Sequence, residues 1–97
     1  MTVADAPRFY GVVKDEDVIS FLRDRPASES LKLRDAIDEL QHNPRPAAHT
    51  AANDFGIPLT KLVISSTRPN YILIYRIDDE NDKVYVIAIT EKVTRRS

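Results

Sequence analysis

Three stretches in the second half of the chain carry the strongest hydrophobic pattern. Residues 59–64, 71–77 and 83–89 are rich in β-branched and aromatic side chains, and polar segments separate them. Such residues favour extended strands, and strands that are apolar on both faces lie in the middle of a sheet. The pattern therefore predicts three consecutive antiparallel strands at the centre of a sheet.

Alternation along these strands assigns their side chains to two faces, because successive side chains of a strand point in opposite directions. In the strand at 71–77, one face holds Tyr71, Leu73, Tyr75 and Ile77, and the other holds Ile72, Ile74 and Arg76. In the last strand, unbroken alternation predicts that Ala88 shares a face with Val84 and Val86, and that Ile89 lies on the other.

The first half of the chain predicts one strand and two helices. Residues 8–13 form a short aromatic and β-branched run, which is typical of an edge strand. Acidic residues at 15–17 suit the first turn of a helix, which Pro26 ends. Ser28 is the expected N-cap of a second helix. Its apolar stripe has the spacing i, i+3, i+4 and i+7 and consists of Leu33, Ala36, Ile37 and Leu40.

The segment 43–58 shows no clear periodicity and is expected to be a long loop. Connections of about fifteen residues are longer than usual, and such loops are commonly functional. His49 lies inside this segment and is a candidate proton carrier. The alternative is that His49 is simply an exposed loop residue.

This order of elements predicts an α+β fold with the sequence β-α-α-β-β-β, in one domain over residues 1–97. We expect the N-terminal strand and the helical hairpin to pack on one face of a small antiparallel sheet, with the first strand at an edge. The opposite face is then left open for a partner or a substrate.

Composition narrows the class of protein. The chain is 42% hydrophobic and 30% charged, and it has no apolar run near the length of about 20 residues that a membrane helix needs. It has no cysteine and no signal-peptide pattern, so we expect a cytoplasmic protein without a membrane partner. The net charge of −1, from 14 basic and 15 acidic side chains, excludes a globally basic surface but permits a local basic patch.

The chain lacks the common cofactor motifs, so no cofactor and no metal are expected. Two glycines cannot supply a phosphate-binding glycine loop, and the acidic run at 78–82 lacks the spacing of a calcium loop. We expect that run to be a polar hairpin turn. What remains is a set of cations that can bind phosphate and stabilise its charge during RNA cleavage: Lys61, Arg68, Arg76, Lys92, Arg95 and Arg96. Alternatively, these are solvated strand ends paired with carboxylates.

Three segments together suggest a family. A helix ends in Leu-Gln-His-Asn-Pro at 40–44, a long loop closes at Leu-Thr-Lys-Leu at 59–62, and Asn-Tyr-Ile-Leu-Ile-Tyr-Arg-Ile at 70–77 precedes an acidic turn and a valine-rich strand. In this order and spacing, the chain resembles the RelE/ParE superfamily of small bacterial toxins from type II toxin–antitoxin modules. The resemblance runs from Tyr10 to about Lys92.

The resemblance implies a cognate antitoxin whose disordered segment wraps the toxin in a heteromeric complex. It also implies one of two activities: an endoribonuclease (mRNA interferase) that cleaves mRNA in the ribosome, or a non-enzymatic inhibitor of DNA gyrase. A third alternative is a member of the superfamily that has lost its toxicity and only binds a partner.

Ribosome-associated mRNA cleavage is the preferred alternative. Lys61 matches a strand lysine of the nuclease branch, and Lys92 is the candidate for the arginine after its last strand. Ile72 stands where that branch usually has arginine. The RNA-cleavage hypothesis assigns phosphate and proton handling to Lys61, Arg76, Lys92 and His49, and RNA binding to Arg68, Arg95 and Arg96.

Overall fold

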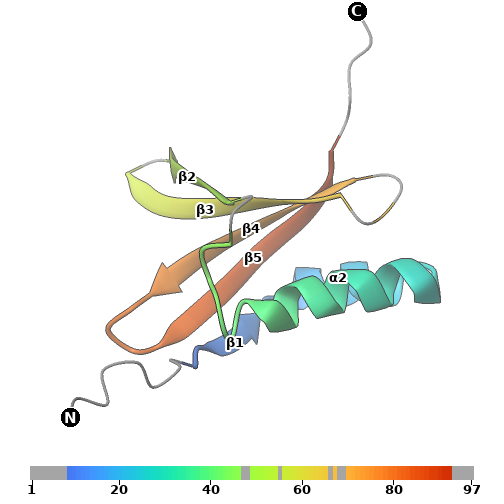
Figure 1. The fold of residues 1–97 in the computed structure, drawn as a ribbon. Coiled ribbons are helices and arrows are strands. Elements are labelled where there is room, and N and C mark those ends of the chain that lie inside the picture. The colour runs from blue at the N-terminus through green and yellow to red at the C-terminus, as the bar shows by residue number, and fades with distance from the viewer. Residues whose placement is uncertain (1–8, 47–48, 55, 66, 68–69, 93–97) are drawn as a thin grey trace, which may run out of the picture.

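Five strands form one sheet, and two helices cover one of its faces (Figure 1). The computed structural model describes residues 9–46, 49–54, 56–65, 67 and 70–92. Along the chain the elements are β1 (Gly11–Lys14), α1 (Glu16–Arg23), α2 (Ala27–Glu39), β2 (His49–Asp54), β3 (Ile57–Ile64), β4 (Tyr71–Asp78) and β5 (Lys83–Glu91). The strand order across the sheet is β1-β5-β4-β3-β2.

The predicted α+β class and the strand–helix–helix–strand order are confirmed, with two additions. The segment expected to be a long loop contains β2, which pairs antiparallel with β3 and forms an edge of the sheet. The first strand lies at the opposite edge as predicted, but it runs parallel to β5. The sheet is therefore mixed rather than purely antiparallel.

The two helices begin with different caps. The Asp15 side chain accepts a hydrogen bond from the Glu16 backbone N–H at 2.7 Å, which satisfies one of the free donors at the start of α1. The predicted N-cap Ser28 of the second helix is wrong. Pro26 holds that position, because its carbonyl already accepts from the Ser30 N–H at 2.9 Å, and no side chain caps α2.

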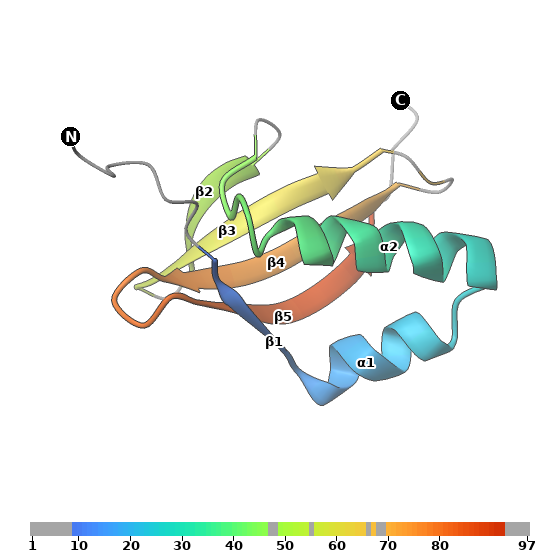
Figure 2. The same cartoon turned by 60° about the horizontal axis from the view of Figure 1, so that its bottom comes forward.

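The core lies between the helices and the sheet (Figure 2). It is formed by side chains that are buried almost completely: Val18 and Leu22 from α1, Leu33, Ile37 and Leu40 around α2, Leu62 and Ile64 from β3, Tyr71, Leu73 and Tyr75 from β4, and Val84, Val86 and Ile89 from β5. Three of the four residues in the predicted stripe of the second helix are in this set, and Ala36 packs against it. Burying a large aliphatic or aromatic side chain of this kind contributes about 1.5–3 kcal/mol.

A β-bulge in β5 changes which side chains face this core. The register pairs Ile74 with Ala88 and Tyr75 with Val86, so Ile87 is an extra residue on β5. After the bulge the alternation is reversed, and Ile89 joins Val84 and Val86 in the core. The predicted faces of Ala88 and Ile89, which assumed unbroken alternation, are therefore wrong.

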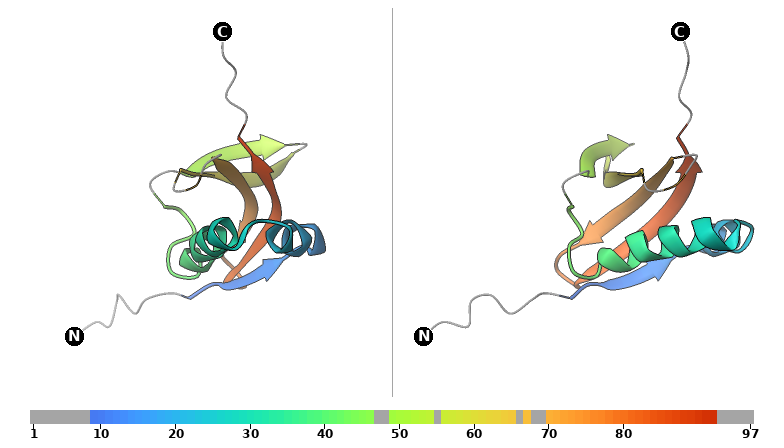
Figure 3. Two further views of the ribbon diagram at one scale, coloured as in Figure 1. Left: turned by 90° about the vertical axis from the view of Figure 1, so that its right-hand side faces the viewer. Right: turned by 45° about the vertical axis from the view of Figure 1, so that its right-hand side comes forward.

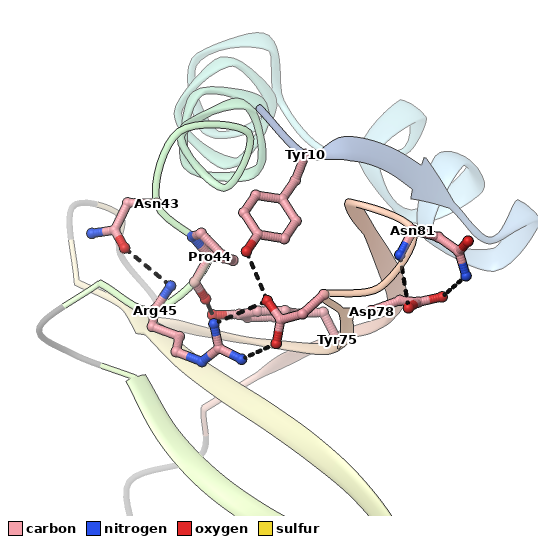
Figure 4. Close-up of polar contacts among 8 residues, drawn as sticks. Tyr10, Asn43, Pro44, Arg45, Tyr75, Asp78 and Asn81 are labelled. Atoms are coloured by element: carbon pink, nitrogen blue, oxygen red, sulfur yellow. Dashed lines mark hydrogen bonds and ion pairs between the residues drawn. The ribbon is translucent and has the colours of Figure 1, made fainter. Parts of the chain in front are cut away.

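A polar cluster ties the connection between α2 and β2 to the turn between β4 and β5 (Figure 4). The Tyr10 hydroxyl donates to Asp79 Oδ1 at 2.7 Å, and the Arg45 guanidinium forms an ion pair with Asp79 Oδ2 at 2.8 Å. The hydrogen bond from Arg45 to Asp79 raises the pKa of the guanidinium. In the same region the buried Tyr75 hydroxyl donates to the Pro44 carbonyl at 2.6 Å. These contacts of Tyr10, Arg45, Tyr75 and Asp79 fix the path of the chain as it leaves α2.

The acidic run at 78–82 is a hairpin turn, as predicted. Asp78 accepts hydrogen bonds from the Asn81 side-chain amide at 2.9 Å and from its backbone N–H at 3.3 Å. These bonds stabilise the carboxylate and lower the pKa of Asp78. Asp82 adopts a positive φ of 52°, which asparagine and aspartate tolerate in tight turns.

Candidate functional site

The sheet face turned away from the helices is the candidate site, which we call the open face. In Figure 3 both helices lie on one side of β4 and β5, and this leaves the other side uncovered. Alternation and register place the following described side chains there: Val13 from β1, Thr50 from β2, Lys61 and Val63 from β3, Ile72, Ile74 and Arg76 from β4, and Tyr85, Ile87, Ala88 and Thr90 from β5.

Two of the predicted phosphate-binding residues are neighbours on the open face. Lys61 lies directly opposite Ile74, and Arg76 is the next residue of β4 on the same face. Such diagonal neighbours have their side chains about 7–8 Å apart, within reach of one phosphate group for two long cations. Lys61 is exposed and Arg76 is half-buried.

Tyr85 completes this cationic end of the open face. It is paired with Arg76 across β4 and β5, and the Arg76 guanidinium carbon lies 4.6 Å from the centroid of its ring. Stacking on an aromatic face orients a guanidinium and keeps its outer N–H groups available. The sequence pattern alone does not predict Tyr85 as a site residue. Asp78 pairs with Lys83, and this register sets Tyr85 opposite Arg76, whereas the predicted turn over 78–82 would pair Ile77 with Lys83 and set Val84 there.

Lys92 lies at the far end of the sheet from this pair. Its backbone N–H donates to the Asn70 carbonyl at 2.8 Å, and Asn70 lies six residues before Arg76. At a rise of about 3.3 Å per residue, the two levels are roughly 20 Å apart. The structure therefore does not bring Lys92 and Arg76 to one phosphate.

His49 lies on the other side of the sheet. It pairs with Leu62, whose side chain is in the core, and directly opposite residues of an antiparallel pair share a face. Its Nδ1 is 2.6 Å from the Pro46 carbonyl, which can only accept, so Nδ1 donates to it. The structure thus separates His49 from Lys61 and Arg76. The other predicted RNA-binding residues, Arg68, Arg95 and Arg96, lie outside the described residues.

The centre of the open face is apolar. Ile72, at the position where the nuclease branch has arginine, is half-buried and lies between Val63 of β3 and Thr90 of β5. The cations are therefore gathered toward the turn between β4 and β5. Asp78 is at the same end, but its carboxylate is occupied by Asn81. The paired cations at this end are suited to binding a phosphate group.

Among the described residues, no group of three or more His, Asp or Glu side chains could hold a metal ion. None of the helices in the described part of the chain is long and apolar enough to cross a membrane.

Comparison with known proteins identifies the fold. No family model and no curated protein sequence matches the chain. Solved structures do match over most of its length. RelE from the intact Escherichia coli RelBE toxin–antitoxin complex is 25% identical with a TM-score of 0.66, and the match covers 88% of this chain and 99% of that one.

Two matches from other organisms agree. The Mycobacterium tuberculosis RelBE2 toxin–antitoxin complex gives 18% identity and a TM-score of 0.71, covering 90% of this chain and 95% of that one. The archaeal RelE–RelB complex from Pyrococcus horikoshii gives 16% identity and a TM-score of 0.70, covering 86% and 94%. The chain has the RelE fold, and this confirms its resemblance to the RelE/ParE superfamily.

Proposed function

We propose that this protein is the toxin of a bacterial toxin–antitoxin module and that it acts on RNA in the cytoplasm. The observation that carries the proposal is the RelE fold, shared over 86–90% of the chain with RelE proteins solved in toxin–antitoxin complexes. By analogy, a cognate antitoxin binds this chain, and growth is inhibited by cleavage of mRNA on the ribosome.

The cationic end of the open face supports a role in phosphate chemistry. In RNA cleavage the 2′-oxygen attacks the adjacent phosphorus, the 5′-oxygen leaves, and negative charge develops on the non-bridging oxygens. Lys61 and Arg76 would stabilise that charge, with Arg76 held in place by Tyr85. A preorganised cation at such a position contributes several kcal/mol to the transition state in typical enzymes.

The apolar centre of the open face favours a second candidate, a toxin that acts by binding a protein such as DNA gyrase. Ile72, Ile74 and Val63 form a surface without charge where a nuclease of this fold would have arginine. Apolar surfaces of this kind are typical of protein interfaces. This alternative needs no catalytic residue, and a member that only binds a partner would share the same surface.

Expression in a bacterial host, with growth, translation and plasmid supercoiling followed together, tests the proposal. We expect growth arrest with loss of translation and cleaved mRNA on translating ribosomes. Lys61→Ala and Arg76→Ala should each slow cleavage at least tenfold, whereas Arg23→Ala, an exposed cation on α1, should not. Growth arrest with relaxed plasmid and intact mRNA would overturn RNA cleavage as the activity and support inhibition of gyrase instead. Unimpaired growth with a folded product would overturn both.

A further inference from the structure

A shallow groove adjoins the cationic end of the open face and has no role in the proposed phosphate chemistry. It has a volume of about 400 Å³ and lies between the β1–β5 pair and the start of α1. Val13, Tyr85 and Ile87 supply apolar and aromatic surface, and Lys14, Asp15 and Glu16 line its polar side.

The β-bulge and the parallel β1–β5 pair shape this groove. Val13 lies directly opposite Tyr85, and Ile87 is the extra residue that the bulge adds to β5. Both aliphatic side chains are well exposed, Val13 at 45% and Ile87 at 39%. The groove thus offers exposed apolar surface beside an aromatic ring, and aromatic side chains stack on planar bases.

The groove and the cation pair share Tyr85. Arg76, Tyr85 and Val13 occupy equivalent positions on three adjacent strands, so Arg76 and Val13 are two strand spacings, or about 10 Å, apart. Arg76 lies over the ring of Tyr85. A phosphate bound by Lys61 and Arg76 would therefore carry its own nucleoside within reach of the groove.

We propose that the groove seats one unstacked base of single-stranded RNA while Lys61 and Arg76 hold the phosphate of that nucleotide. This inference rests on the proposed action on RNA and adds a determinant of base preference to it. Carboxylates accept hydrogen bonds from exocyclic amino groups, which cytosine, adenine and guanine carry and uracil lacks. Asp15 and Glu16 at the groove therefore select an amino-bearing base against uracil.

Binding of uncleavable RNA tests the inference directly. The probes are fluorescently labelled, fully 2′-O-methylated hexanucleotides of uridine whose third residue is uridine, cytidine, adenosine or guanosine, and anisotropy is measured with the full chain. We expect at least one amino-bearing base to improve affinity about fivefold or more over uridine. Tyr85→Leu should weaken that binding by about 5- to 100-fold, and Tyr85→Phe should retain it.

A second variant keeps the test independent of the folding of Tyr85→Leu. Val13→Trp fills the groove from an exposed position and leaves Lys61 and Arg76 untouched, so it should abolish base preference and retain weak, salt-sensitive binding. If all four probes bind with equal affinity, and if neither Tyr85→Leu nor Val13→Trp changes that affinity, the inference is overturned. Binding would then be explained by phosphate contacts alone. Loss of protein-partner binding in Val13→Trp, with RNA binding unchanged, would overturn it in favour of a protein anchor.

The outcomes separate this inference from the proposed function. No binding of any probe overturns the base seat, whereas mRNA cleavage on ribosomes still decides the proposed activity. Base-selective binding without cleavage on ribosomes would instead retain the seat and overturn the endoribonuclease.

Discussion

Tyr75 shows how a single side chain joins the core to a connection outside it. The residue is fully buried, and its hydroxyl donates to the Pro44 carbonyl just after α2. Burial disfavours the phenolate and raises the pKa of Tyr75 to about 12. The hydroxyl is thus protonated in the folded protein at neutral pH.

This pKa predicts loss of stability at alkaline pH. The unfolded chain releases the Tyr75 proton near pH 10 and the folded protein near pH 12, so stability is complete below pH 10 and falls as pH rises toward 12. The loss should be on the order of 2–3 kcal/mol. Urea unfolding between pH 8 and pH 12 measures it. Tyr75→Phe should reduce the dependence of the unfolding free energy on pH in this range. The part that remains is due to Tyr71, because burial also raises the pKa of Tyr71.

Substitutions of Arg45 and Asp79, which form one ion pair, should reduce the free energy of unfolding by different amounts. Arg45→Ala removes an ion pair whose side chains are about half exposed, so it should cost less than about 1 kcal/mol of unfolding free energy. Asp79→Ala also removes the acceptor of the Tyr10 hydroxyl and should cost about 1–2 kcal/mol. Denaturant unfolding compares them, with Glu80→Ala, an exposed residue of the same turn, as control. Equal losses for Asp79→Ala and Glu80→Ala would contradict this account.

At the residue scale, the sequence predicted which side chains are available but not which of them meet. Alternation predicts that Arg76 faces away from Tyr71 and Leu73, and the structure confirms it, since both of those side chains are in the core. Only the register makes Lys61 and Arg76 neighbours, and it places Lys92 at the far end of the sheet. The sequence alone does not separate His49 from these cations, because it does not predict the strand that sets the face of His49.

At the scale of elements, β2 is the strand that the sequence does not predict. Its residues, His-Thr-Ala-Ala-Asn-Asp, include a single β-branched side chain, so local preference does not favour a strand. Pairing with β3 supplies the missing stabilisation. The one usable signal is Gly56, which has a φ of 76° in the turn before β3 and marks a tight hairpin.

Because the β-bulge adds one residue to β5, we expect the fold to tolerate the deletion of that residue, Ile87. Removing Ile87 leaves β5 with regular alternation, in which Val84, Val86 and Ile89 still face the core. The variant should retain its fold and lose no more than about 1 kcal/mol. Removing Ile74 from β4, where no extra residue exists, turns Leu73 and Tyr71 away from the core and should unfold the protein. Circular dichroism and thermal unfolding of the two deletions make the comparison, and equal damage would argue against the bulge.

At the scale of the whole molecule, the net charge of −1 limits how RNA can be bound. Attraction must come from the local cations rather than from the overall charge. With Lys61 and Arg76 as the two phosphate contacts, the slope of log affinity against log salt should be about −1.4 for single-stranded RNA. Titration of the hexanucleotides at several salt concentrations measures it. Arg76→Ala should reduce the slope by about 0.7, and a slope unaffected by this change would remove Arg76 from the phosphate site.

The parallel pairing of β1 with β5 determines when the sheet can be completed during synthesis of the chain. Val12 aligns with Val84, so the strands that meet are the first and the last of the described chain. Contacts between residues this distant in sequence form late in folding. The entropy cost of closing the intervening chain must be met before the contacts stabilise the fold. During synthesis the sheet therefore remains open until β5 has left the ribosome. Arg76, Tyr85 and Val13 meet only in that step, so the cation pair with its stacked tyrosine and the neighbouring groove form together, after β5 has been synthesised.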